Sequence, residues 1–163
     1  MRDLVAGIVA VLLLLAAASL ATTLRSYRRR RQRARDSEGA LGRVVIAELP
    51  TAADLVLVSQ DDKRFYYGEH SIDKDLIVAV RMLINGSPIA AAVSRRHAAG
   101  APLQPTRFED RPEGIARDRW DVAIETVAGT TLIECGAIRE RVSQELARTV
   151  FDAIKKDLEQ RER

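Results

Sequence analysis

The stretch from Trp120 to Leu158, WDVAIETVAGTTLIECGAIRERVSQELARTVFDAIKKDL, contains the pattern that decides the fold. Its first part alternates apolar and polar residues around Ala128-Gly129-Thr130, which predicts a β-hairpin. Its second part repeats apolar residues every four positions without Gly or Pro, which predicts an amphipathic helix over about 138–160. Its apolar positions are Ile138, Val142, Leu146, Val150, Ile154 and Leu158. This order predicts an α+β domain in which the helix packs on a sheet.

Further β-rich runs precede this stretch. Short antiparallel strands are predicted at residues 43–49, 54–60 and 63–68. From Asp75 to Val93 the pattern allows either a helix capped by Asp73 or a hairpin that turns at Asn85-Gly86. We favour the hairpin, because Asn-Gly is the strongest short-range hairpin signal. The domain is therefore expected to be mainly antiparallel β-structure.

Residues 94–119 form a long segment with three prolines and no sustained period, which predicts a loop. Its six arginines and four acidic residues give it a net charge of +2, and apolar residues lie between them. Such a loop either binds a partner or is a mobile excursion without a function. The candidate partner-binding residues are Arg95, Arg96, Leu103, Arg107, Phe108 and Arg111.

Near the amino terminus, the 21 residues from Leu4 to Leu24 contain no charge. This length matches the roughly 20 residues that a helix needs to cross a bilayer, so the sequence predicts a single transmembrane helix. The alternative is a cleaved signal peptide, since Ser19-Leu20-Ala21 has the small-x-small form of a cleavage site. The arginine-rich segment directly after Leu24 disfavours cleavage and translocation.

That segment contains seven arginines within eleven residues. They are Arg25, Arg28, Arg29, Arg30, Arg31, Arg33 and Arg35. Positive charge marks the cytoplasmic side of a membrane helix, so we expect the amino terminus outside, the rest cytoplasmic, and a location in the cell (inner) membrane. The same arginines are candidates for contact with anionic lipid head groups. The expected organisation is a tail and transmembrane helix at 1–24, an Arg-rich juxtamembrane segment and linker at 25–41, and a soluble domain at 42–163.

The overall charge of +3 hides an uneven distribution. Residues 1–35 hold eight arginines and one aspartate, a net charge of +7, whereas the remaining residues carry −4. The folded part is mildly acidic, so a basic face for nucleic acid is not indicated. Cys135 is the only cysteine, which excludes an intrachain disulfide.

The order of elements resembles the pleckstrin-homology-like (PH-like) domains, including those of bacterial membrane proteins. The segments that carry the resemblance are FYYGEHSIDKDLIVAV, from Phe65 to Val80, and the hairpin and helix from Trp120 to Leu158. The resemblance implies a bent sheet or barrel of about six to seven strands closed by the C-terminal helix. It also implies protein docking rather than inositol-phosphate binding, because the loop from Leu49 to Asp54 contains no basic residue.

No motif for catalysis or for metal binding is present. The sequence lacks GxSxG, GxxxxGK[ST], GxGxxG before a helix, and HExxH. His70 and His97 are far apart in the sequence, and Cys135 is expected to be a buried structural thiol. We therefore expect no enzyme activity, no catalytic residues, no metal, no cofactor and no small-molecule substrate.

The resulting hypothesis is a non-enzymatic, membrane-anchored interaction protein, an accessory or docking subunit of a larger membrane assembly. Its expected partners are membrane lipids and other integral membrane subunits. The alternative is a sensor of anionic lipid surfaces that uses the arginine run and the 94–119 loop.

Overall fold

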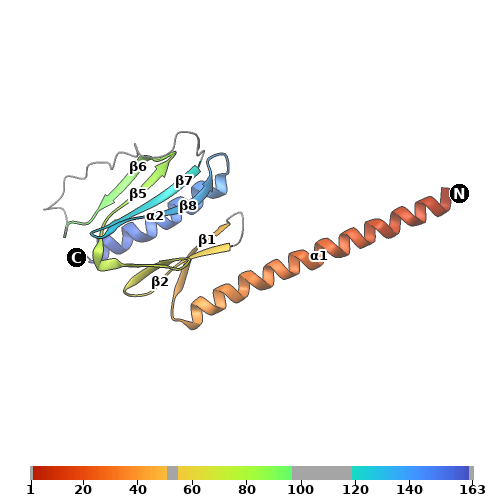
Figure 1. Cartoon of the computed structure of the whole chain (residues 1–163), viewed down its shortest axis with the longest axis horizontal. Helices are drawn as coiled ribbons and strands as arrows, with labels where there is room; N and C mark the ends of the chain where they lie inside the picture. Colours follow the sequence, from red (N-terminus) through yellow and green to blue (C-terminus); the bar gives the residue numbers. More distant parts are fainter. Residues whose placement is uncertain (1, 51–54, 97–118, 162–163) are drawn as a thin grey trace. The chain divides into compact units, whose positions relative to one another are not determined.

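The computed structural model describes residues 2–50, 55–96 and 119–161, with side chains from residue 12 onward (Figure 1). The chain divides into two compact units, Met1–Leu41 and Gly42–Arg163. The N-terminal unit is a single helix, α1 (Arg2–Ala40). The described part of the C-terminal unit contains eight strands, one 3₁₀ helix and the helix α2 (Arg141–Arg161).

Helix α1 corrects the prediction for the amino-terminal region. It continues without a break through the arginine run and through residues expected to form a linker. Among the residues with described side chains, no helix is long and apolar enough to cross a membrane. A helix needs about 20 residues to cross a bilayer. A stretch of that length that begins at Leu12 includes five arginines, at position 25 and at positions 28–31. This finding overturns the predicted transmembrane helix at Leu4–Leu24, the single-pass topology and the cell-membrane location.

The strands form two antiparallel sheets of four strands each. The first sheet has the order β1-β2-β3-β4, with β1 (Val44–Pro50), β2 (Leu55–Gln60), β3 (Arg64–Tyr67) and β4 (His70–Asp73). The second has the order β6-β5-β7-β8, with β5 (Ile77–Ile84), β6 (Ser87–Val93), β7 (Arg119–Thr126) and β8 (Gly129–Ala137). The α+β character expected from the sequence is therefore present.

The sheets do not join into the barrel that the PH-like resemblance implied. No described strand of the first sheet pairs with a strand of the second, so the predicted closed barrel of six to seven strands is wrong. The separation begins at the 3₁₀ helix η1 (Lys74–Leu76), which turns the chain between β4 and β5. The carboxylate of Asp73 accepts a hydrogen bond from the backbone N–H of Asp75 and caps this turn.

The segment from Asp75 to Val93 forms the β5–β6 hairpin and not the alternative helix. Asn85 and Gly86 both have positive φ angles, 52° and 82°. Two successive positive φ angles match the right-handed twist of the flanking strands, which explains why Asn-Gly predicts this turn.

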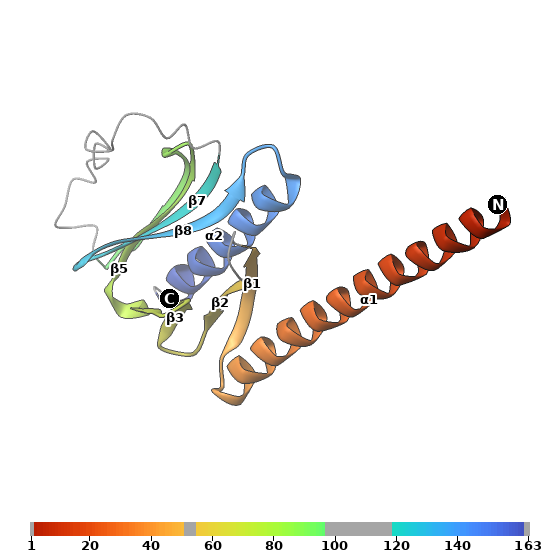
Figure 2. The same cartoon turned by 45° about the vertical axis from the view of Figure 1, so that its right-hand side comes forward.

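Helix α2 lies between the two sheets and contacts β1 on one side and β5, β7 and β8 on the other (Figure 2). Its buried side chains are Ser143, Ala147, Val150, Phe151, Ile154 and Leu158. Val142, expected in the apolar stripe, is 62% exposed. A repeat of four residues drifts around a helix that has 3.6 residues per turn. Val142 is twelve residues from Ile154, so its side chain points about 120° away from that of Ile154.

Cys135 lies in β8 within the core that α2 and the sheets share. Burial is the main cause that raises the pKa of its thiol to about 12, and the nearby charge of Asp121 acts in the same direction. The thiolate is the reactive form of cysteine. At neutral pH this side chain is therefore a protonated, apolar part of the core.

We expect the Cys135 thiol of the folded full-length chain to resist a water-soluble disulfide reagent at pH 8. Labelling should proceed only as fast as the chain unfolds, and the same chain in denaturant should react at once. The measurement is the labelling rate with and without denaturant. Immediate reaction of the folded chain would contradict the buried, protonated state.

Candidate functional site

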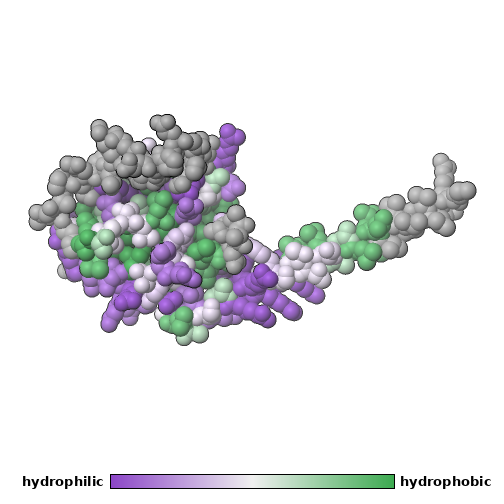
Figure 3. Space-filling model, viewed as in Figure 1, coloured by the Kyte–Doolittle hydropathy of each residue, from purple (hydrophilic) through white to green (hydrophobic). Residues whose placement is uncertain are grey.

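The apolar part of α1 exposes large side chains in every direction around the helix. Six leucines are 54–70% exposed. They are Leu12, Leu13, Leu14, Leu15, Leu20 and Leu24. Because consecutive residues of a helix point about 100° apart, the first four alone cover the whole circumference. Figure 3 shows this apolar surface along α1, next to a hydrophilic region. A helix that is apolar all round is normally buried.

The seven predicted head-group contacts come directly after these leucines on α1, and all seven arginines are exposed. A groove of about 400 Å³ runs along this part of the helix. It is lined by Thr22, Arg25, Ser26, Arg29, Arg30 and Arg33. The two hydroxyl groups donate to backbone carbonyl oxygens of α1, at 2.8 Å in each case, so the guanidinium groups are the free donors of the groove.

The charges of this groove are not neutralised within the described chain. Arg25, Arg29 and Arg33 are spaced at i, i+4 and i+8, and none has an acidic partner among the described residues. Like charges at this spacing each destabilise a helix by about 0.2–0.5 kcal/mol. An anionic partner would remove this repulsion and form charge-assisted hydrogen bonds with the guanidinium groups.

Only part of the predicted partner-binding loop can be placed. Leu103, Arg107, Phe108 and Arg111 lie outside the described residues. Arg96 donates a hydrogen bond to the main-chain oxygen of Arg161 and lies 3.9 Å from the Asp75 carboxylate. Arg96 therefore has a role within the C-terminal unit, at the end of α2.

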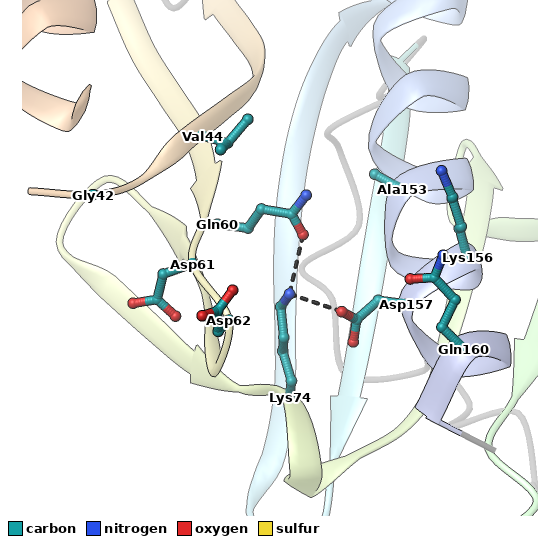
Figure 4. Close-up of a pocket in the computed structure, with 10 residues that line it drawn as sticks. All are labelled: Gly42, Val44, Gln60, Asp61, Asp62, Lys74, Ala153, Lys156, Asp157 and Gln160. Carbon is teal, nitrogen blue, oxygen red and sulfur yellow. Dashed lines mark hydrogen bonds and ion pairs between the residues drawn. The ribbon is translucent and has the colours of Figure 1, made fainter. Parts of the chain in front are cut away.

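A polar crevice of about 460 Å³ lies between the β2–β3 turn and α2 (Figure 4). Its lining is Gly42, Val44, Gln60, Asp61, Asp62, Lys74, Ala153, Lys156, Asp157 and Gln160. The Lys74 side chain lies between the β2–β3 turn and α2, with its ammonium group between Gln60 and Asp157 (Figure 4). Sequence reasoning missed this cluster, because Gln60, Lys74 and Asp157 are far apart in the chain and belong to no motif.

Lys74 is the centre of an ion-pair network. Its Nζ lies 2.8 Å from Asp157 Oδ1 and 3.1 Å from Gln60 Oε1, and it lies 4.5 Å from the centre of the Phe65 ring. The Lys74 side chain is 4% exposed and that of Asp157 is 16% exposed. A buried ammonium is tolerated only where its donors are satisfied, and this one has a carboxylate, an amide and an aromatic face.

Arg161 extends the network across the end of α2. Its Nε lies 2.9 Å from Asp157 Oδ2 and its Nη1 lies 2.6 Å from Asp75 Oδ1. Its Nη2 donates to the main-chain oxygen of Asp62 at 2.5 Å. Together, Lys74 and Arg161 tie α2 to η1 and to the β2–β3 turn. The network therefore stabilises the fold, and we call these contacts of Lys74 and Arg161 the clasp.

The chemistry available in the crevice is limited. Its lining contains no Ser, Thr, Cys or His side chain, so no hydroxyl, thiol or imidazole among these lining residues can act as nucleophile or base. In the described part of the chain, no three His, Cys, Asp or Glu side chains converge as metal ligands. Asp62, Lys156 and Gln160 line the opening with side chains that have no partner among the described residues. The crevice therefore offers carboxylate, amide and ammonium groups to a polar ligand.

Asp61 shapes the turn at one side of the crevice. Its Oδ1 accepts hydrogen bonds from the backbone N–H groups of Lys63 and Arg64, both at 2.7 Å, and its Oδ2 accepts one from the Tyr66 hydroxyl at 2.7 Å. The Tyr66 hydrogen bond is the largest cause that lowers the Asp61 pKa to about 2, and the same bond raises the Tyr66 pKa.

Comparison with protein families, with curated proteins and with solved structures finds no match to this chain. The PH-like resemblance therefore stays a prediction that rests on the order of elements alone. The function must be inferred from the surfaces of the two units.

We expect Lys74→Met to lower the free energy of unfolding by about 3 kcal/mol, because it leaves part of a buried ion pair without its partner. The matched control is Lys156→Met, the same change at an exposed lysine of the same crevice. That control should change stability by no more than about 0.5 kcal/mol. Urea unfolding of both variants is the measurement, and equal effects would contradict the clasp.

Asp61 should make the stability of the turn depend on acid pH. Its pKa in the folded chain is about 2 and its ordinary value is 3.8, so its ionised form stabilises the fold above pH 3.8. This contribution is lost as the pH falls through the folded value. Asp61→Asn should therefore be less stable than the native chain at pH 6, with the difference shrinking toward pH 2. An equal difference at both ends, measured by denaturant unfolding, would exclude ionisation as the cause.

Proposed function

We propose that this protein is a non-enzymatic docking component of a larger assembly and that α1 is its attachment element. The observation that carries the proposal is the set of six exposed leucines that surround α1. Burying a leucine side chain stabilises a complex by about 2 kcal/mol. A partner that encloses this part of α1 would therefore gain substantial binding free energy.

The arginines define the chemistry of that partner. Four guanidinium groups line one groove immediately beyond Leu24, the last exposed leucine within α1. The complementary surface is an apolar channel or groove for the leucines with carboxylates at its rim for the arginines. Charged rim contacts mainly set orientation and association rate, whereas the enclosed leucines supply affinity.

A second candidate is attachment to an anionic lipid surface without crossing it. The specific observation in its favour is the contiguity of exposed leucines and unneutralised arginines on one helix. Basic residues near an anionic surface contribute about 1 kcal/mol each at physiological ionic strength. Such binding would depend on the arginines more than on any single leucine.

The docking proposal is tested with full-length chain carrying a carboxyl-terminal tag. After the retained partner is identified by mass spectrometry, we expect Leu13→Ala to weaken its binding about 30-fold, which corresponds to the loss of about 2 kcal/mol. The control Val127→Ala changes an apolar residue of similar exposure, 61%, in the C-terminal unit and should leave binding unchanged. Equal retention of both variants would contradict docking through α1.

The lipid candidate predicts a different pattern. The full-length chain should sediment with vesicles that contain anionic phospholipid and not with neutral ones, and Arg29→Gln should weaken this binding in a salt-dependent way. Failure to bind anionic vesicles at physiological salt would exclude the lipid candidate and leave the protein partner.

A further inference from the structure

We propose that the free edge of β6 pairs antiparallel with β6 of a second copy of this chain, around a twofold axis at Ala91. This inference is independent of the docking role of α1, because it concerns only the C-terminal unit. It begins with the position of β6 in the second sheet. There β6 is the outermost strand, and its described pairing is with β5 alone.

One hydrogen bond shows which backbone groups of β6 point toward β5 and which point away from it. The backbone N–H of Ser94 donates to the carbonyl oxygen of Val78 at 2.8 Å, toward β5. In an antiparallel ladder the backbone groups of alternate residues face the same neighbour. Ala92 and Ala90 therefore also face β5, while the N–H and C=O groups of Ala91 and Val93 face away from it. Those outward groups have no partner among the described residues.

The other sheet edges differ from β6. Strand β4 has four residues, begins with His70 and ends with Asp73, and β1 and β8 contact each other. Strand β6 has seven residues, SPIAAAV, without a charged side chain. Natural sheets protect exposed edges with charges, prolines or bulges. Here Pro88 and the register shift opposite Met82/Leu83 protect the start of β6, whereas Ala90–Val93 has no such device.

The side chains of β6 suit pairing with an identical strand. Ile89, Ala91 and Val93 are exposed on one face, and Ala90 and Ala92 pack against the core on the other. A twofold axis at Ala91 pairs residues 90–92 of the two copies and brings Ile89 of each copy, the residue at the register shift, next to Val93 of the other. These side chains are 50% and 37% exposed in the single chain, so pairing would shield both.

Charge is compatible with the same arrangement. Arg95 and Arg96 lie in the turn that follows β6 and Ser94, and the twofold axis puts the turns of the two copies at opposite ends of the paired strands. The arginines of the two copies therefore lie at opposite ends of the paired strands and do not repel one another at close range. A seam of two strands is small by the standard of stable interfaces, so the expected dissociation constant is in the micromolar range.

The first experiment uses two single-cysteine additions to the full-length chain. In the proposed register, Ala91→Cys brings its own Cα to about 5.5 Å from that of the second copy, within the range of a disulfide. The matched control Val93→Cys lies on the same face and strand, but its two copies would be about 14 Å apart by the strand rise. Cys135 is buried and does not compete.

Under oxidised glutathione, the two thiols of Ala91→Cys pass two electrons to the oxidant and form one interchain disulfide. We expect covalent dimer from Ala91→Cys at a rate at least tenfold above that from Val93→Cys. Equal rates, or no dimer from either variant, would overturn the proposed pairing.

Sedimentation of the unmodified chain provides a second measurement that needs no cysteine. Association should increase with protein concentration and weaken at least tenfold in Ala91→Lys, which places two ammonium groups opposite each other at the axis. Leu13→Ala should retain this association, because α1 takes no part in it. A chain that stays monomeric at all concentrations, or association lost in Leu13→Ala and kept in Ala91→Lys, would contradict the β6 seam.

Discussion

The C-terminal unit depends on the burial of one side of α2 between two sheets that do not pair with each other. Val150 and Ile154 are fully enclosed there, and each buried aliphatic side chain contributes about 2 kcal/mol relative to an exposed one. Close packing of these side chains holds α2 against the sheets. The ion pair between Lys74 and Asp157 adds a directional contact between η1 and α2, with Nζ 2.8 Å from Oδ1.

Local patterns in the sequence predicted much of this unit, and the exceptions have physical causes. Alternation and the Asn85-Gly86 turn located most strands, because both reflect contacts between near neighbours. Strand β4 was missed, since Ile72 is its only buried residue and four residues are too few to show a period. The barrel was wrongly inferred because closure depends on pairing between distant strands, which no local pattern encodes.

The two candidate sites also differ in whether the sequence alone reveals them. The arginines of α1 are neighbours in the sequence, so their concentration of charge is visible without a structure. The partners Lys74 and Asp157 are 83 residues apart, and only the fold brings them together. The apolar stretch from Leu4 to Leu24 has the length of a span when it is taken apart from its neighbours, and this led to the wrong prediction. In the structure it is the first part of a helix that continues through the arginines to Ala40.

The place of α2 in the chain also affects how the protein is made. All eight described strands are synthesised before the helix that fills the space between their sheets. At about 5–20 residues per second, the 21 residues of α2 take about 1–4 s to synthesise, and the strand faces that contact α2 have no cover before then. During that interval the exposed leucines of α1 have already left the ribosome. The strand faces that contact α2 can therefore be covered only after α2 has been synthesised.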